Sequence, residues 1–306
     1  MKLCQFEAPG RGLRVGVVEG DAVIDVTATR GGIGSVLDLI VRGRTAAGVE
    51  RLARRLARGA RRPRQTWADL DRAPTARRPG LAPPLAPPEV WGAGITYRRS
   101  AEYYTEHESG HPARVKGIYD YVYGSERPEL FFKATAARCA GPHAPIGIRG
   151  DSTLTAVEAE LACVIGAGGR IVGYTVGNDL SAWDIERENP LFLPQSKIFS
   201  GCFALGPVIA TTSSVPDPHA LTIRCVIERQ GDVIYDGQAS TRDLKRRCEE
   251  LADWLGRYNP VPPGTVLSTG TGILVPDEHA LRPGDQIAIT IDGIGTLRNP
   301  VRRLGR

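Results

Sequence analysis

The chain has 306 residues, a formal net charge of +5 at pH 7, and 42% hydrophobic and 24% charged residues. This composition predicts a soluble globular protein with a sizeable core, and the length favours one large domain together with a smaller one. No apolar run approaches the roughly 20 residues that span a bilayer, which argues against a membrane partner. Residues 1–12 lack the apolar region of a signal peptide, so we expect a cytoplasmic location.

The positive charge raises nucleic acid as a possible partner. Basic residues are densest over 42–64, in "RGRTAAGVERLARRLARGARRPR". No aromatic residue interleaves these arginines, so nothing there would stack on bases. Only five of the 39 basic residues are lysine, a bias typical of a GC-rich genome. We therefore expect no nucleic-acid partner.

The six cysteines are scattered and form no CxxC pair, which predicts reduced, buried thiols rather than a disulfide framework or a zinc site. They are Cys4, Cys139, Cys163, Cys202, Cys225 and Cys248.

The first 72 residues predict a small N-terminal α+β domain. Residues 1–30 alternate short apolar stretches with glycine turns, which favours a β-meander with a hairpin turn at 19–21. Residues 35–60 carry apolar side chains at helical spacing. The stretch 73–88 is rich in proline, so it can be neither a regular helix nor a central strand and is predicted to be a linker.

Residues 89–306 predict a mostly β domain of the α+β class, either a barrel or a layered roll. Two helices are expected, over 97–108 and 241–258, the second with Thr241 as its N-cap. Turn residues separate the apolar runs of strand length, which are 161–165, 171–176, 203–210, 221–228, 232–235, 265–268 and 286–291.

Two glutamates interrupt one of these strands, in "TAVEAELACVIG" over 155–166. Side chains alternate between the faces of a strand, so Glu158 and Glu160 share a face and lie only ~7 Å apart. Both faces are apolar after Glu160, which predicts a strand inside the domain. Poorly solvated like charges at this spacing resist joint ionisation, so either one carboxyl is protonated or a cation compensates the pair.

A third acid, Asp179, ends the strand-like stretch "IVGYTVGND". With Glu158 and Glu160 it makes an oxygen-only ligand set that suits Mg²⁺, with Mn²⁺ or Ca²⁺ as alternatives, and disfavours zinc. From spacing alone a second interpretation stays open. In it, the glutamates begin an edge strand and face water, and Asp179 only caps a turn.

Five stretches, in this order and spacing, resemble the fumarylacetoacetate hydrolase superfamily over residues 88–303. They are "VEAELACVIG", "IVGYTVGNDLSAWDIE", "LPQSKIFSGCFALGP", "VLSTGTG" and "LRPGDQIAITIDGIGTLRNPV". The resemblance implies a β-rich roll, usually a homodimer and often with a small N-terminal domain. It implies a divalent metal on Glu158, Glu160 and Asp179, a lysine beside it at Lys197, and a site threonine at Thr271.

Three further stretches look like the branch of sugar-acid dehydratases that act on 2-keto-3-deoxy acids. They are "GITYRRSAEYY", "RPELFFKAT" and "ENPLFLPQSK". Hydrolases of the superfamily often carry a His and a Glu on a lid segment, where the pair activates water. Here those positions hold Ser100 and Tyr103, which weakens hydrolysis. Hydrolysis is not excluded, because one turn later the chain carries other residues that could act as a base, Glu106, His107 and Glu108.

The resemblance implies a mechanism in which a metal-chelated 2-keto acid loses its C3 proton to give an enolate. Lys197, His107 and Glu108 are the candidate catalytic residues, and metal and nearby cations would lower the pKa of Lys197. Arg99, Ser100, Lys133 and Thr271 are the candidate substrate-binding residues. Asp184 and Glu188 follow the metal aspartate and suit supporting roles.

The leading hypothesis is a metal-dependent dehydratase of a 2-keto-3-deoxy sugar acid. Its first alternative is a hydrolase or decarboxylase of acylpyruvate-like acids, because the same metal platform serves all three reactions. The second alternative is a family member without catalysis, against which the intact set of three acids and Lys197 argues.

Overall fold

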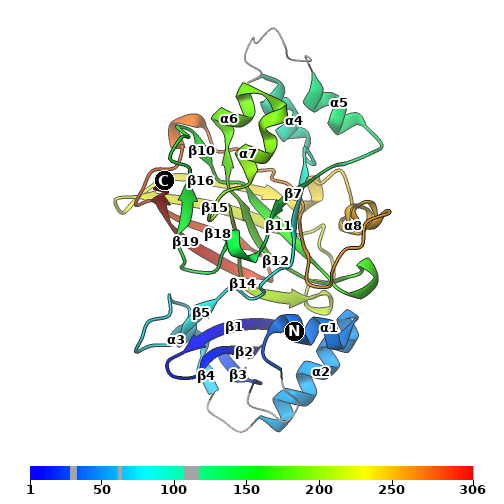
Figure 1. Cartoon of the computed structure of the whole chain (residues 1–306), viewed down its shortest axis with the longest axis vertical. Helices are drawn as coiled ribbons and strands as arrows, with labels where there is room; N and C mark the ends of the chain where they lie inside the picture. Colours follow the sequence, from blue (N-terminus) through cyan, green and yellow to red (C-terminus); the bar gives the residue numbers. More distant parts are fainter. Residues whose placement is uncertain (28–32, 61–63, 107–116, 306) are drawn as a thin grey trace.

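The computed structural model describes residues 1–27, 33–60, 64–106 and 117–305, so the predicted bases His107 and Glu108 lie outside the described residues (Figure 1). The architecture is sheet-rich α+β, as predicted. Within the described ranges the strands do not close into a barrel, so the layered roll is the form that fits.

In the described part of the chain, the largest sheet has 12 strands. Its path runs through β4 (Arg64–Thr66), β3 (Ala22–Asp25), β2 (Gly12–Glu19), β1 (Lys2–Ala8), β14 (Phe203–Thr211), β12 (Ile171–Asp179), β11 (Ala159–Ile165), β17 (Val266–Ser268), β6 (Val90–Gly94) and β7 (Glu129–Ala134), with β5 (Gly80–Ala82) beside β1 and β8 (Cys139–Ala140) beside β14.

A second sheet of five strands packs on the first, because β15, β18 and β19 contact β11, β12 and β14. Its strands, in order, are β16 (Asp232–Ser240), β15 (Thr222–Arg229), β18 (Gln286–Ile291), β19 (Gly295–Arg303) and β9 (Ile146–Ile148). A short ladder joins β10 (Thr155–Ala156) to β13 (Ser181–Ala182).

Helices gather at the two ends of the molecule (Figure 1). At the N-terminal end are α1 (Val36–Gly43), α2 (Ala46–Gly59) and α3 (Trp67–Leu70), and at the other end are α4 (Arg98–Glu106), α5 (Ile118–Gly124), α6 (Trp183–Glu188) and α7 (Leu193–Lys197). The helix α8 (Cys248–Gly256) lies at the side, and the 3₁₀ turns are η1 (Ala136–Arg138), η2 (Ala167–Gly169), η3 (Pro190–Phe192), η4 (Thr212–Ser214), η5 (Thr241–Asp243) and η6 (Asp277–His279). Among the described residues, none of these helices combines the length and apolar character that a membrane crossing requires.

The N-terminal segment folds as its sequence pattern predicts. Strands β1, β2 and β3 form the meander, and α1 and α2 follow. Ser35 caps α1 in a capping box with Asp38, and Gln5 of β1 accepts the Val36 N–H at 2.8 Å, which fixes the helix against the sheet. The proline-rich stretch contains β5 at the edge of β1, so it is more ordered than a free linker. The domain boundary at 73–88 stays a prediction.

The prediction of one helix over 241–258 is wrong at its start. Thr241 begins the 3₁₀ turn η5, and the α-helix α8 begins seven residues later at Cys248. The intervening backbone is committed elsewhere: Leu244 bridges to Tyr97, and the Lys245 N–H donates to the Thr96 carbonyl at 2.9 Å. A long-range pairing therefore outweighs the local helical pattern.

Strand β11 is buried along its whole length between β12 and β17. This excludes the interpretation in which its glutamates belong to a water-facing edge strand. Glu160 pairs in register with Gly177, and the Asp179 N–H donates to the Glu158 carbonyl at 3.0 Å. The antiparallel register thus brings the end of β12 beside the start of β11.

Two Arg–Asp pairs on β15 predict different contributions to stability. Arg229 binds both oxygens of Asp285 at 2.9 Å, and the Asp285 side chain is 1% exposed. Arg224 binds Asp236 in the same bidentate way, but these side chains are 51% and 41% exposed. We expect Asp285→Ala to lower the free energy of unfolding by about 3 kcal/mol, because it leaves the Arg229 guanidinium, which is 18% exposed, without its counter-charge. Asp236→Ala should leave the free energy of unfolding nearly unchanged, because solvent screens this exposed pair. Urea unfolding measures both, and equal losses would contradict this expectation.

Candidate metal centre and active site

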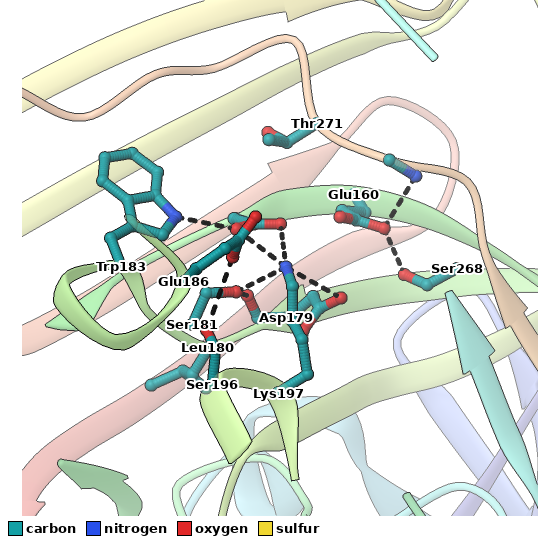
Figure 2. Close-up of polar contacts among 12 residues, drawn as sticks. Glu160, Asp179, Leu180, Ser181, Trp183, Glu186, Ser196, Lys197, Ser268 and Thr271 are labelled. Atoms are coloured by element: carbon teal, nitrogen blue, oxygen red, sulfur yellow. Dashed lines mark hydrogen bonds and ion pairs between the residues drawn. The ribbon is translucent and has the colours of Figure 1, made fainter. Parts of the chain in front are cut away.

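Three buried carboxylates converge where β11 begins and β12 ends. One oxygen from each of Glu158, Glu160 and Asp179 lies within 4.8 Å of the others. Their side chains belong to residues that are 5%, 2% and 1% exposed, and Figure 2 shows Glu160 and Asp179 facing this common space. An all-oxygen donor set of this charge fits a hard dication such as Mg²⁺.

Glu160 is held from β17 and the turn that follows it. Its Oε2 accepts hydrogen bonds from the Ser268 hydroxyl and, at 2.8 Å, from the Gly270 N–H (Figure 2). Burial, and then the charges of Asp179 and Glu158, raise the pKa of Glu160 well above its ordinary value. A bound dication would offset this repulsion, so the residues fit a metal.

Lys197 carries positive charge into the same cluster from the end of α7. Its Nζ donates to both oxygens of Glu158 at 2.9 Å and to the Ser181 hydroxyl at 2.6 Å, and it lies 3.7 Å from Asp179 Oδ2. Burial by itself would lower the pKa of Lys197, but Asp179, Glu158 and Glu186 together raise it well above its ordinary value. In this arrangement, without a metal, the ammonium is protonated, and the lowered pKa that the sequence predicts for the metal-bound site stays a prediction.

Glu158 is the carboxylate with the most hydrogen-bond donors around it. The Trp183 indole N–H donates to Oε1 at 2.9 Å, in addition to the contacts from Lys197. Burial opposes ionisation, but Lys197 and these hydrogen bonds lower the pKa of Glu158 below its ordinary value. Glu158 is therefore ionised, and its orientation is fixed by Trp183 and Lys197.

Lys133 contacts Asp179 and the backbone of the next residue. Its ammonium is fully buried, pairs with the Asp179 carboxylate, and donates to the Leu180 carbonyl at 2.7 Å. Lys133 does not line the cavity described below. The geometry favours a role in orienting Asp179 over the predicted contact with a substrate carboxylate.

A small cavity of about 30 Å³ adjoins the three carboxylates and Lys197. Its other polar lining residues are Ser100 of α4, Glu129 of β7, Glu186 of α6 and Thr271 after β17. A larger groove of about 850 Å³ lies between η4 and α8, but it contains none of these residues. We place the candidate site at the small cavity, because the carboxylate cluster lies there.

The turn at Gly270 connects helix α4 to the group of three carboxylates through hydrogen bonds. The Ser100 hydroxyl donates to the Thr271 carbonyl at 2.6 Å, and the Thr271 hydroxyl donates to the Ala159 carbonyl at 3.0 Å. Gly270 has φ +90°, and a Cβ there would lie 2.1 Å from the Thr96 hydroxyl, so only glycine fits. Ser100 and Thr271 thus reach the cavity as predicted candidates, whereas Arg99 is exposed in an outer groove beside β16.

Two acids that line the cavity were missed in the sequence. Glu186 on α6 is buried, and burial raises its pKa to about 7 although Lys197 opposes the shift. Burial also raises the pKa of Glu129 at the start of β7. Period-two spacing from Lys133 could have indicated Glu129, and helical spacing from Trp183 could have indicated Glu186.

The predicted supporting acids on either side of Glu186 lie elsewhere. Asp184 accepts hydrogen bonds from the Ser152 hydroxyl and the Thr153 N–H, and so closes a turn outside the cavity. Glu188 is exposed. On this short helix, Glu186 is the acid of the three that lines the cavity.

Comparison with known proteins gives consistent matches. Residues 90–302 match the family model "Fumarylacetoacetate (FAA) hydrolase C-terminal". The chain is 46% identical over 223 residues to 2-dehydro-3-deoxy-D-arabinonate dehydratase of Saccharolobus solfataricus, covering 73% of this chain and 74% of the relative. It is 46% identical over 218 residues to a probable 2-keto-3-deoxyxylonate dehydratase of Haloferax volcanii, covering 71% and 73%. Among solved structures, 2-keto-3-deoxy-D-arabinonate dehydratase complexed with magnesium and 2,5-dioxopentanoate aligns with a TM-score of 0.82 at 34% identity, over 100% of both chains.

Glu158 and Glu160 should respond in opposite ways to the same substitution when metal is chelated. A carboxyl with a raised pKa binds its proton more tightly in the folded state, so stability falls as pH rises above the ordinary value of 4.5. Glu160→Gln removes this loss and should raise the free energy of unfolding at pH 8 by about 1–2 kcal/mol. Glu158→Gln breaks the contacts to Lys197 and Trp183 and should lower it by about 3 kcal/mol. Urea unfolding in EDTA tests both, and a decrease in both variants would count against this account.

Proposed function

The chain belongs to the fumarylacetoacetate hydrolase family, and we propose that it is a Mg²⁺-dependent dehydratase of a 2-keto-3-deoxy sugar acid. The observation that carries the proposal is the convergence of Glu158, Glu160 and Asp179 with Lys197 beside one buried cavity. The relatives with 46% identity that act on such acids support the substrate class.

Glu158, Glu160 and Asp179 would hold the Mg²⁺ ion. When bound, the ion supplies a Lewis acid that polarises the keto and carboxylate oxygens of a 2-keto acid. The groups around these ligands then set their orientation: Ser268 and Gly270 at Glu160, Trp183 at Glu158, and Lys133 at Asp179.

Dehydration needs a base for the proton at C3 and an acid for the departing C4 hydroxyl. Glu129 and Glu186 line the cavity with raised pKa values, so each can hold a proton closer to neutral pH than an ordinary glutamate. Burial opposes the charge on Lys197, but Asp179, Glu158 and Glu186 raise its pKa, so Lys197 would provide positive charge for the oxygen on which negative charge develops. We propose Glu129 and Glu186 as the proton-transfer pair, with His107 and Glu108 remaining predictions outside the described residues.

At the two described positions where hydrolases of the family often carry a water-activating pair, the geometry gives no support to the hydrolytic alternative. Ser100 and Tyr103 stand where hydrolases of the family often carry a water-activating pair. The Ser100 hydroxyl donates to the Thr271 carbonyl, and the Tyr103 hydroxyl donates to Asp277 at 3.1 Å. Neither side chain is an imidazole or a carboxylate that could deprotonate water.

We also propose that the protein is a cytoplasmic homodimer, with an N-terminal domain over 1–72, a linker over 73–88 and a catalytic domain over 89–306. The dimer rests on the usual assembly of the family, and light scattering coupled to gel filtration would test it.

The first test is the reaction itself. Purified protein with Mg²⁺ should convert 2-keto-3-deoxypentonate to a product lighter by one water, and an acylpyruvate should stay intact. EDTA should abolish turnover, and Mg²⁺ should restore it. Mass spectrometry of the products separates the outcomes, because C–C scission of the acylpyruvate without dehydration would favour the hydrolase alternative.

The second test compares two acids on α6. Glu186→Gln should lower kcat by about 100-fold or more, since it removes a proton-transfer group from the cavity. Glu188→Gln, two residues along the same helix, is the matched control and should keep kcat within about twofold, as expected for an exposed side chain. Similar kcat values for the two variants would remove Glu186 from the mechanism.

A further inference from the structure

A polar cluster joins α4, α6 and the 3₁₀ turn η6, and it contains none of the three proposed metal ligands. Arg187 at the end of α6 donates to both oxygens of Asp277 at 2.6 and 2.9 Å and to the Tyr103 hydroxyl at 3.1 Å. Tyr103 belongs to α4 and itself donates to Asp277. The bidentate pair and the shared hydroxyl give the Arg187 guanidinium a defined position.

The same guanidinium also contacts two aromatic rings. Its central carbon lies 5.3 Å from the centroid of the Trp183 ring and 5.8 Å from that of Tyr103. The two rings are 5.6 Å apart. Arg187 therefore holds the indole on one side through cation–π contact while Asp277 holds Arg187.

Trp183 carries this contact to the metal site. It is fully buried, and Figure 2 shows its indole nitrogen pointing toward the carboxylate cluster, where it donates to Glu158 Oε1 at 2.9 Å. Hydrogen bonds to a ligating carboxylate set its orientation and contribute to metal affinity. A continuous series of contacts thus runs from Asp277 through Arg187 and Trp183 to Glu158.

Trp183 packs outside the main apolar core. Among the described residues it belongs to a separate small apolar cluster with Tyr119 and Ala156, against which Tyr103 and Leu154 pack. A small cluster resists displacement of a large indole less than a continuous core does. The contact from Arg187 therefore matters more for the position of this ring than it would inside the sheet.

We propose that Arg187 is a positioning residue for Glu158, acting through Trp183, and that Asp277 and Tyr103 keep Arg187 in place. The proposal rests on the proposed metal site. It predicts that Arg187 affects Mg²⁺ affinity although it touches none of the three carboxylates, and that its effect depends on Trp183.

A double-mutant cycle on Mg²⁺ affinity tests the dependence. Isothermal titration with MgCl₂, without substrate, gives Kd for the wild type, Arg187→Met, Trp183→Phe and the double variant. Each single variant should raise Kd about tenfold, as is typical for groups that support metal ligands. The double variant should also raise Kd about tenfold rather than multiply the two effects, because both changes remove the same hydrogen-bond geometry at Glu158.

The controls separate positioning from general stability. Arg224→Met breaks an exposed Arg–Asp pair on β15 and should leave Kd unchanged. Thermal melting by circular dichroism checks that each variant is folded. If Arg187→Met does not fold, Asp277→Asn replaces it in the cycle with the same expected non-additivity.

Three results would overturn this assignment. Multiplicative effects in the double variant, or an unchanged Kd in Arg187→Met, would remove Arg187 from the control of Glu158 while the metal site stands. A wild type that does not bind Mg²⁺ would instead remove the proposed metal site, and the positioning role with it.

Discussion

Three carboxylate oxygens lie within 4.8 Å of one another inside the protein, one each from Glu158, Glu160 and Asp179. The surrounding groups offset the repulsion among these charges. Lys197 and Lys133 bring two ammonium groups into the same interior. Backbone and hydroxyl donors meet Glu160, and an indole meets Glu158. Buried charges persist only where partners of this kind surround them. The need to compensate them explains why Lys133 of β7, Trp183 of α6, Lys197 of α7 and the Gly270 turn meet at one place.

The two sides of the cavity differ in how they are supported. Its floor comes from β11, β12 and β17, whose residues belong to the main apolar core. Its other side comes from α4, α6 and α7, and α4 and α6 pack with α5 around a separate small apolar cluster. A cavity of about 30 Å³ has room for roughly two waters. A 2-keto-3-deoxy acid of the proposed class is larger than this cavity.

The sequence predicts the convergence of the three carboxylates well, because their signal is local and periodic. Alternation along one strand puts Glu158 and Glu160 on one face, and the end of the next strand supplies Asp179. The resemblance to the family adds Lys197 and Thr271. Lys133 shows where such reasoning stops. An apolar surrounding predicts its burial, but its pairing with Asp179 rather than with substrate depends on a contact between residues 46 positions apart in the chain. The predicted helix start at Thr241 is wrong for the same reason, because a pairing between Leu244 and Tyr97 replaces the helix that the local sequence favours.

The pairing of β1 with β14 has a consequence for the independence of the two halves of the chain. Lys2 and Leu3 complete the hydrogen bonding of β14 near its end, and β8 covers its beginning. On its other side, β14 pairs with β12, which carries Asp179. Cutting away the N-terminal segment would leave the end of β14 around Ile209 and Ala210 without its neighbouring strand, and an unpaired edge of this kind can recruit other chains into aggregates. The N-terminal segment is therefore a structural part of the large sheet that protects this strand edge, and not a part that could be removed without consequence.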